Sequence, residues 1–331
     1  MTSISGLGPH GERAASPDHL SLSDAEIATS RARRPQVAVL LHTTTSDWAR
    51  LELAGIGTTL ERYGASVREV VDCSFRIETQ ISALQRLAAD PPDAVISLPI
   101  ASTAVAEAHR RISRAGVKLV LLDNGPTGLL PGTDYVSVVS ADNFGLGSIA
   151  ARLLAPHVRQ GGKVGVLSYQ ADFFATNERE IAFRKWIGSE RPDIGLHPIR
   201  FSGLAAVAEP LTRFLDQHPD VAALFAVWDV PAATAVSVLR ARAQHLPMTT
   251  IDLGKEVAIA LARGDLIKGV AAQRAYDQGV AAAMATLSAL VGRQPPSWLV
   301  LPGEAVTPRD VGDAYRRIWH EQPPREVIEM T

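Results

Sequence analysis

The chain has 331 residues, of which 46% are hydrophobic and 21% charged, and its formal net charge is -2 at pH 7. This near-neutral balance gives no general attraction to nucleic acid or to an anionic membrane. A single cysteine, Cys73, excludes an internal disulfide and a cysteine-based zinc cluster. Because one hydrophobic core seldom extends over so many residues, we expect two lobes.

Residues 1–35 are rich in Ser, Gly, Ala, Arg and Pro and contain no apolar stretch of the length that a signal peptide needs. We therefore expect an N-terminal extension that is partly disordered and carries no export signal. Within it, Ser23 followed three residues later by Glu26 is the pattern of a capping box, which predicts a short helix. No later apolar run reaches transmembrane length.

From residue 36 onward, short apolar strands alternate with amphipathic helices, which is typical of right-handed βαβ units and a parallel sheet. The predicted strands are 37–41, 66–71, 94–98, 119–122, 136–139, 163–167, 197–201, 223–227, 248–251, 267–271 and 298–301. The predicted helices are 49–63, 77–89, 102–115, 143–154, 177–189, 205–217, 231–243, 255–263 and 276–291.

The order of these elements predicts an α/β fold of two Rossmann-like lobes joined by several strands. We expect lobe 1 to comprise residues 36–140 plus 275–300 and lobe 2 residues 141–274 plus 301–325. The crossovers at 139–142, 273–276 and 298–302 are the predicted hinge.

Polar and aromatic clusters follow most of the predicted strands, where ligands bind in an open parallel sheet. Trp48 and Trp228 stand beside carboxylates, and an indole face can cover the C–H face of a sugar while carboxylates accept its hydroxyl hydrogens. Asp123 and Asp252 also end strands, and a buried carboxylate there needs donors from a ligand or from neighbours. Core filling is the alternative for the tryptophans, and helix capping for the aspartates.

Several catalytic and cofactor motifs are absent or misplaced. Gly145 and Gly147 match a relaxed dinucleotide fingerprint, but they fall inside a predicted helix while Asp142 occupies the turn, so we interpret them as packing glycines. There is no Walker loop, no nucleophile elbow and no metal-ligand spacing among the nine histidines. His42 alone is placed to face a strand-end cleft. The sequence predicts no catalytic residue, no metal and no cofactor.

Residues 36–310 resemble the type I periplasmic sugar-binding proteins, the ribose-binding-protein group, whose fold also forms the effector domain of lactose-repressor-like regulators. The resemblance rests on the order and spacing of five segments. They are Ser46-Asp47-Trp48 with Gly55, Leu122-Asp123-Asn124, Ser140-Ala141-Asp142-Asn143 with Gly147, residues 218–225, and residues 273–279. It implies a two-lobed protein that closes around its ligand.

The resemblance also implies ligand contacts. Trp48 takes the place of a stacking ring, Ser46 that of an amide, and Asp123 that of a carboxylate gripping vicinal hydroxyls. Where the family has two arginines this chain has Asn124 and Asn177, with Arg179 close enough to substitute for the second. Further implied contacts are Trp228, in place of a polar residue, Asp252 and Gln273. Asp142 and Asp229 are interpreted as helix caps rather than contacts.

These departures favour a small neutral sugar or polyol over ribose or a sugar acid. By the resemblance, the protein is a non-catalytic, monomeric solute-binding protein of the periplasm that delivers its ligand to the membrane permease of an ABC transporter. The alternative is a cytoplasmic sugar sensor related to repressor effector domains.

Direct DNA binding is not expected, because only 36 residues precede Val37 and no basic recognition helix is visible. An enzyme would need a base and an electrophile in the cleft.

Overall fold

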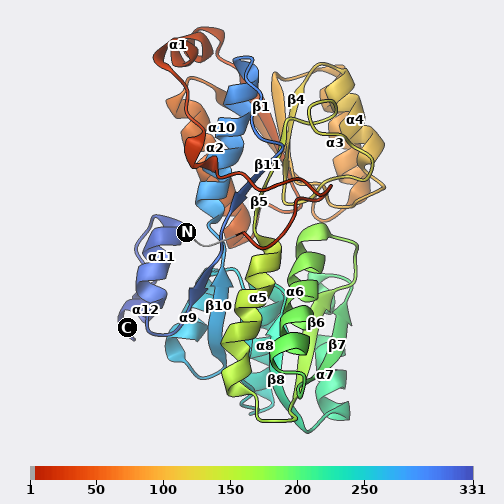
Figure 1. Cartoon of the computed structure of the whole chain (residues 1–331), viewed down its shortest axis with the longest axis vertical. Helices are drawn as coiled ribbons and strands as arrows, with labels where there is room; N and C mark the ends of the chain where they lie inside the picture. Colours follow the sequence, from red (N-terminus) through yellow and green to blue (C-terminus); the bar gives the residue numbers. More distant parts are fainter. Residues whose placement is uncertain (1–3, 331) are drawn as a thin grey trace.

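The computed structural model describes residues 4–330 and consists of two α/β lobes, stacked one above the other in Figure 1. Each lobe is built on a six-stranded sheet, and the strand at Glu304–Val306 is one that we did not predict. We define lobe 1 and lobe 2 by these two sheets. The predicted fold class, two parallel sheets flanked by helices, is confirmed.

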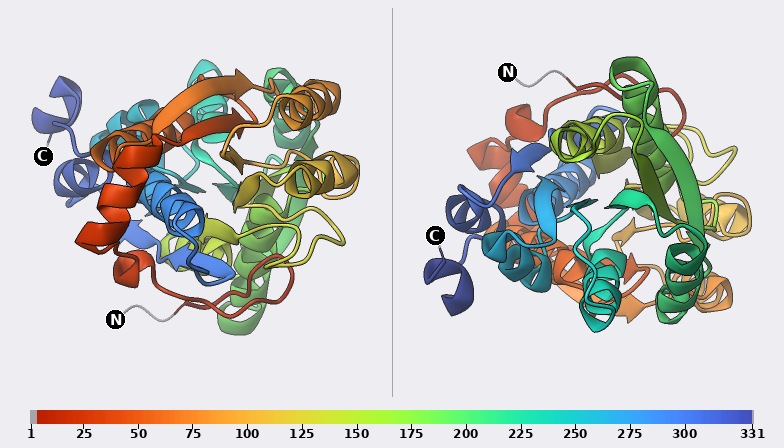
Figure 2. Two further views of the ribbon diagram at one scale, coloured as in Figure 1. Left: turned by 90° about the horizontal axis from the view of Figure 1, so that it is seen from above. Right: turned by 90° about the horizontal axis from the view of Figure 1, so that it is seen from below.

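The sheet of lobe 1 is entirely parallel, with the strand order β11-β5-β4-β3-β1-β2. Its strands are β1 (Gln36–Leu41), β2 (Ser66–Asp72), β3 (Ala94–Ser97), β4 (Lys118–Leu122), β5 (Ser137–Ala141) and β11 (Trp298–Leu301). Its helices are α2 (Asp47–Arg62), α3 (Ile77–Ala89), α4 (Ala106–Arg114) and α10 (Ala275–Leu290). Seen from above, α2 and α10 lie on one side of the sheet and α3 and α4 on the other (Figure 2, left).

Strand β1 shows why its apolar run is unbroken. Val37, Val39 and Leu41 pack into one hydrophobic cluster, and Ala38 and Leu40 pack into the cluster on the opposite face. A parallel sheet covered by helices on both faces buries successive side chains in two cores. The continuous hydrophobicity of this segment follows from that double burial.

Lobe 2 has the strand order β12-β10-β9-β8-β6-β7, in which only β12 runs antiparallel to its neighbour. Its strands are β6 (Lys163–Tyr169), β7 (Gly195–Phe201), β8 (Val221–Ala226), β9 (Met248–Ile251), β10 (Ile267–Ala272) and β12 (Glu304–Val306). Its helices are α5 (Asn143–Leu154), α6 (Phe174–Glu190), α7 (Ala208–Gln217), α8 (Asp229–Ala241), α9 (Lys255–Arg263), α11 (Val311–Trp319) and α12 (Arg325–Ile328), with short 3-10 turns at Ala155–His157 and Leu204–Ala206.

The chain passes between the two sheets three times, from β5 to α5, from β10 to α10 and from β11 to β12. Close to the first crossing, Asp142 caps α5 by accepting a hydrogen bond from the Gly145 amide at 2.9 Å. Gly147 lies inside α5, and a Cβ there would come within 2.2 Å of the Arg179 carbonyl oxygen. The interpretation of this glycine as a packing residue is confirmed.

The described part of the N-terminal extension packs on lobe 1. Helix α1 (Asp24–Arg33) begins with the predicted capping box of Ser23 and Glu26, and a 3-10 turn at Pro17–His19 precedes it. Ala15 pairs with Leu299 beside β11, and upstream of it the Glu12 carboxylate accepts a hydrogen bond from the Tyr135 hydroxyl. Residues 1–3 of the predicted extension lie outside the described residues.

No helix within residues 4–330 has both the length and the apolar character needed to span a bilayer.

Candidate functional site

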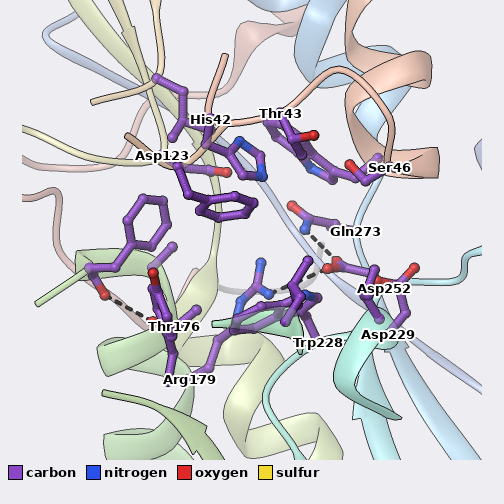
Figure 3. A pocket seen from close by; sticks show the side chains of 18 residues that line it. His42, Thr43, Ser46, Asp123, Thr176, Arg179, Trp228, Asp229, Asp252 and Gln273 are labelled. Atoms are coloured by element: carbon purple, nitrogen blue, oxygen red, sulfur yellow. Dashed lines mark hydrogen bonds and ion pairs between the residues drawn. The ribbon is translucent and has the colours of Figure 1, made fainter. Parts of the chain in front are cut away.

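A pocket lies between the two lobes, where the carboxyl ends of both sets of parallel strands meet (Figure 3). Lobe 1 and lobe 2 both contribute walls, and Gln273 on the second crossing joins them. The lining residues are His42, Thr43, Ser46, Trp48, Phe75, Leu98, Asp123, Tyr169, Phe173, Ala175, Thr176, Arg179, Leu204, Trp228, Asp229, Val230, Asp252 and Gln273. Seven of the nine residues expected to contact a ligand are among them.

Asp123 and Asp252 face the pocket from opposite lobes, each directly after a central strand. Both have a left-handed backbone, with φ of 54° and 71°, which is uncommon for residues other than glycine. Their side chains are deeply buried, with residue exposures of 4% and 7%. Strained backbone that persists at a buried polar position is often associated with function.

Amide side chains hold these two carboxylates. Gln278 of α10 donates from Nε2 to Asp123 Oδ1 at 3.0 Å, and Gln273 donates from Nε2 to Asp252 Oδ1. The Gln273 Oε1 atom is buried without a hydrogen-bond partner in the described structure. An acceptor left unpaired beside a pocket is suited to a ligand hydroxyl or N–H group.

Arg179 of α6 is the cation of the pocket wall, and its guanidinium group already forms hydrogen bonds and an ion pair with other residues of the protein. Its Nε donates to Asn143 Oδ1 at 2.9 Å, and its Nη1 donates to the Val227 carbonyl at 3.2 Å. The same Nη1 lies 3.4 Å from Asp252 Oδ2, an ion pair in which both side chains are buried. Arg179 therefore holds Asp252 in place and ties α6 to α5 and to the end of β8.

Burial sets the protonation of several lining groups. Desolvation raises the pKa of Asp123 to about 6 and raises that of Asp229 well above its ordinary value, and repulsion from Asp252 adds to both shifts. Desolvation also lowers the pKa of His42 to about 4, so this imidazole is neutral at pH 7. Its Nδ1 atom is buried without a partner in the described structure.

Aromatic rings form much of the remaining wall. The Trp228 ring packs edge-on against Tyr169 at a centroid separation of 5.6 Å and lies 5.3 Å from Phe201. On the lobe 1 side, the His42 ring lies 5.6 Å from Trp48 and 4.9 Å from Phe75. These rings offer flat apolar faces between the carboxylates.

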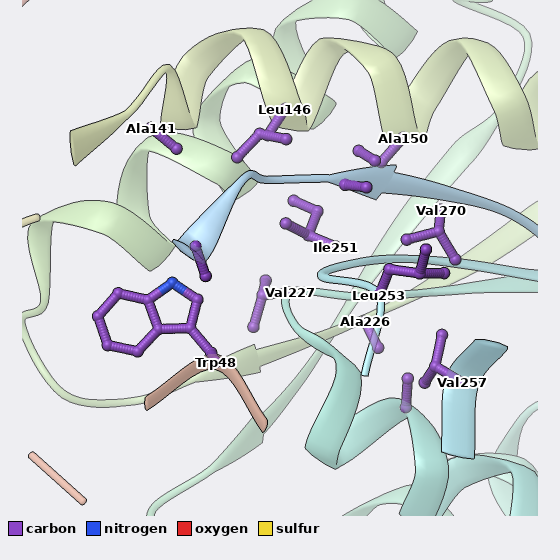
Figure 4. Close-up of a cluster of buried hydrophobic side chains, with 14 of the residues drawn as sticks. Trp48, Ala141, Leu146, Ala150, Ala226, Val227, Ile251, Leu253, Val257 and Val270 are labelled. Carbon is purple, nitrogen blue, oxygen red and sulfur yellow. The ribbon is translucent and has the colours of Figure 1, made fainter. Parts of the chain in front are cut away.

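Trp48 serves both the core and the pocket. Its indole belongs to the large buried cluster that includes Ala141, Val227 and Ile251 (Figure 4), and the same side chain lines the pocket. Its Nε1 hydrogen has no acceptor in the described structure. The two interpretations considered for this residue therefore do not exclude each other.

Ser46 also has a structural task. Its Oγ accepts a hydrogen bond from the Ala49 amide at 3.2 Å, which caps α2, and the residue is only half-buried at the pocket wall. The hydroxyl can still donate a hydrogen bond to a ligand, because capping uses it only as an acceptor.

Two expected contacts lie elsewhere. Asn124 is fully buried and donates from Nδ2 to the Pro99 carbonyl at 2.9 Å, so its amide faces the interior of lobe 1. Asn177 donates to Asp172 Oδ1 at 3.0 Å and does not line the pocket. Residues 177 and 179 are two positions apart on α6, about 200° around the helix, so Arg179 and Asn177 point to different sides.

Asp229 was not expected to contact a ligand, but it lines the pocket. The sequence suggested that it caps a helix beginning near Pro231, but α8 begins at Asp229 itself and Trp228 occupies the N-cap position. With a residue exposure of 8%, the carboxylate lines the pocket instead. Phe75, Tyr169, Phe173 and Thr176 are further lining residues that we did not predict. The only signal for them was their position after strands or at the start of a helix.

One hydrogen bond crosses between the lobes beside the pocket. Asp47, at the start of α2 in lobe 1, accepts a hydrogen bond from the Lys255 amide at 2.7 Å. Lys255 is the first residue of α9 in lobe 2, and the N-cap of that helix, Gly254, has no side chain to cap it. Asp47 therefore caps a helix of the opposite lobe.

No group of three or more His, Cys, Asp or Glu side chains in the described range is arranged to hold a metal ion. Two lobes, three crossings and a pocket between the lobes define the class of hinged ligand-binding proteins. A sequence profile of the family described as "Periplasmic binding protein domain" matches residues 37–294, and the chain belongs to this family.

Known relatives agree with this assignment. The chain is 24% identical over 204 residues to the ribose import binding protein RbsB of Bacillus subtilis, a match that covers 62% of this chain and 65% of that protein. Among solved structures, it is similar to an ABC transporter solute-binding protein from Agrobacterium vitis bound with α-D-tagatopyranose. That match has a TM-score of 0.79 and 22% identity, and it covers 86% of this chain and 99% of the other.

Two further structures have the same fold. One is a carbohydrate transporter solute-binding protein from Agrobacterium radiobacter in complex with D-arabinose, with a TM-score of 0.78 and 18% identity over 86% of this chain and 99% of that one. The other is an ABC transporter solute-binding protein from Mycobacterium smegmatis with bound glycerol, with a TM-score of 0.76 and 18% identity over 84% of this chain and 96% of that one.

Proposed function

We propose that this protein captures a monosaccharide-sized sugar or polyol between its lobes and delivers it to the membrane permease of an ABC transporter. The observation that carries the proposal is a pocket between the lobes to which each lobe contributes both a strand-end carboxylate and aromatic rings. A ligand that contacts both walls stabilises the closed arrangement, because only that arrangement makes both sets of contacts. The family and the relatives named above support transport rather than cytoplasmic sensing.

The contacts we propose are Ser46, Trp48, Asp123, Arg179, Trp228, Asp252 and Gln273. Asn124 and Asn177 are no longer among them, for the reasons given above. Carboxylates and amides would hold ligand hydroxyls, and the two indoles would cover the apolar face of the ring or carbon chain.

A thermal-shift screen against sugars, polyols and sugar acids tests this proposal. A ligand present at about 100 times its dissociation constant stabilises the folded state by about 2.7 kcal/mol. For a ligand found in this way, we expect Trp228→Leu to weaken binding at least tenfold. Asn177→Ala, on α6 but outside the pocket, should leave binding unchanged. A screen without a single stabilising carbohydrate, or equal affinities for the two variants, would contradict the proposal.

We also infer that the protein acts as a monomer in the periplasm and binds its ligand without altering it. Light scattering after size-exclusion chromatography measures the mass in solution, and fractionation of the native cells locates the protein. Recovery of the unchanged ligand by NMR after prolonged incubation is the expected result. A stable dimer, a cytoplasmic location or conversion of the ligand would each overturn the corresponding part of this inference.

A further inference from the structure

The pocket lining contains more acidic than basic side chains. Asp123, Asp229 and Asp252 contribute three carboxylates, whereas Arg179 is the only lysine or arginine among the lining residues. Arg179 pairs with Asp252, and neither Asp123 nor Asp229 has an ion-pair partner in the described structure. His42 adds no positive charge at pH 7, since its pKa is lowered to about 4.

Acidic side chains surround Asp229. Repulsion from Asp252 and Asp47 helps to keep the Asp229 carboxyl protonated, and Arg179 opposes this only weakly. Asp47 is already engaged by the Lys255 amide, and Asp252 by Gln273 and Arg179. Asp229 is therefore a buried carboxyl of the pocket wall without an ion-pair partner in the described structure.

The aromatic side chains of the pocket form a second, independent observation. Trp48, Phe75, Tyr169, Phe173 and Trp228 all line the same pocket as the carboxylates. The faces of such rings attract cations as well as the C–H groups of sugars, and carboxylates form strong, charge-assisted hydrogen bonds with cationic donors. The buried Nε1 of Trp48 has no acceptor in the described structure and can donate to a ligand hydroxyl.

From this geometry we propose that the natural ligand is a sugar or polyol bearing a protonated amino group, with the ammonium bound at Asp229 and its hydroxyls held by Asp123 and Asp252. The inference rests on the proposed function and replaces the neutral ligand expected from the sequence. Hydroxyl groups can donate to carboxylates but bring no positive charge, and a sugar acid would add to the repulsion. An ammonium group beside Asp229 would favour the ionised carboxylate and form an ion pair with it.

Isothermal titration of the full chain with matched sets of ligands tests the proposal. Each set has one carbon skeleton in four forms, namely the amine, its N-acetyl derivative, the parent sugar or polyol and the corresponding acid, and hexosamines and amino-hexitols supply the skeletons. We expect an amine to bind at least tenfold more tightly at pH 7 than the three other forms of its set. This comparison uses the unmodified protein and does not depend on the folding of a variant.

The variant Asp229→Asn then locates the ammonium group. We expect it to reduce the preference for the amine to less than threefold, while Asn177→Ala retains the full preference, and thermal melting shows that both variants are folded. If a parent sugar or N-acetyl form binds as tightly as the amine, the inference is wrong and the proposed function stands. If no form of any set binds but the thermal-shift screen finds another stabilising sugar or polyol, the inference is wrong and the proposed function stands; if neither experiment finds a ligand, both are wrong. A preference that survives Asp229→Asn would overturn the assignment to this residue.

Discussion

Asp123 and Asp252 occupy matching positions in the two lobes. The Asp123 amide donates to Val139 O of the adjacent strand β5 at 3.0 Å, and the Asp252 amide donates to Ala271 O of the adjacent strand β10 at 3.1 Å. Each residue has a left-handed backbone and a carboxylate oxygen that accepts a hydrogen bond from a glutamine amide. The repeated strand-end geometry thus presents one carboxylate from each side of the pocket.

The first prediction concerns the charge of Asp123. Asn has the same shape and tolerates a left-handed backbone, so Asp123→Asn removes the charge with little strain. Because burial raises the pKa of Asp123 from 3.8 to about 6, the folded state binds more protons than the unfolded state between these values, and stability falls as pH rises through this window. We expect Asp123→Asn to lack this loss, about 3 kcal/mol above pH 6, in urea unfolding measured from pH 4 to 8.

The same variant is expected to bind carbohydrate at least tenfold more weakly, since a hydrogen bond to a charged group contributes about 1.5 to 3 kcal/mol. Asp216→Asn, an exposed substitution at the end of α7, is a control for both measurements. If Asp123→Asn has the affinity and the pH profile of the unmodified protein, Asp123 neither binds the ligand nor carries a buried charge.

The second prediction concerns the cap that Asp47 provides to α9 across the lobe interface. Removal of a helix cap costs about 0.5 to 2 kcal/mol, and here this cost applies only when the lobes are closed. We expect Asp47→Ala to weaken ligand binding by about threefold to thirtyfold in titration calorimetry, although Asp47 is not part of the pocket lining. Small-angle X-ray scattering at subsaturating ligand should show a larger radius of gyration than for the unmodified protein.

Asp24→Ala is the matched control for this variant. Asp24 is likewise an acidic residue in the first turn of a helix, but it is exposed on α1. Its substitution should change neither affinity nor scattering. Equal affinities for Asp47→Ala and Asp24→Ala would show that the interlobe cap does not stabilise closure.

The third prediction compares two glycines of α2. A Cβ at Gly55 would lie 2.1 Å from the Tyr276 carbonyl oxygen of α10, whereas Gly57 has no heavy atom within 4 Å of such a Cβ. We expect Gly55→Ala to destabilise the protein by about 1 to 3 kcal/mol through overpacking of the two helices. Gly57→Ala should stabilise it by about 0.5 to 1 kcal/mol, because alanine is the better helix former. Chemical unfolding of both variants measures the difference, and a tolerated Gly55→Ala would mean that α2 and α10 pack less closely.

The fourth prediction concerns the N-terminal extension and acid. The Glu12 carboxylate accepts hydrogen bonds from the Tyr135 hydroxyl and from the His10 amide, and its pKa is lowered to about 2, against the cost of burial. A carboxylate with a lowered pKa contributes stability above its unfolded value of 4.5, and this contribution is lost as pH falls from 4.5 to 2.

We expect Tyr135→Phe to cost about 1 to 2 kcal/mol at pH 7, where the ionised Glu12 carboxylate loses this donor and keeps its His10 contacts, and less at pH 3. Unfolding at the two pH values measures this difference. Tyr63→Phe, at the C-cap position of α2, serves as the control. A cost for Tyr135→Phe that is the same at both pH values would show that Glu12 does not depend on this hydroxyl.

Much of the architecture is encoded locally. The strand at Gln36–Leu41 could be predicted because both faces of a parallel sheet are buried, so that its apolar run is continuous. Helix α1 could be predicted from Ser23 and Glu26, whose reciprocal hydrogen bonds depend only on neighbours three residues apart. The carboxylates that follow the central strands could also be identified, because the carboxyl ends of parallel strands meet at one edge of the sheet, where ligands bind.

The side-chain composition of the pocket depends on features that no local pattern contains. Asn177 and Arg179 are two residues apart, and only the rotation of α6 against α5 determines which of them faces the ligand. Asp229 lines the pocket because α8 begins two residues earlier than expected. The charge balance around it depends on Asp47 and Asp252, which are distant in the chain.

The sequence by itself therefore determined the two-lobed α/β fold and the strand-end carboxylates Asp123 and Asp252, because secondary structure and strand direction follow from short-range periodicity and burial. Only the tertiary structure decided that Asp229 joins the pocket, that Asn124 and Asn177 leave it, and that Asp47 caps a helix of the opposite lobe. These outcomes depend on helix rotation and on the approach of the two lobes, which are set by packing between segments far apart in the chain.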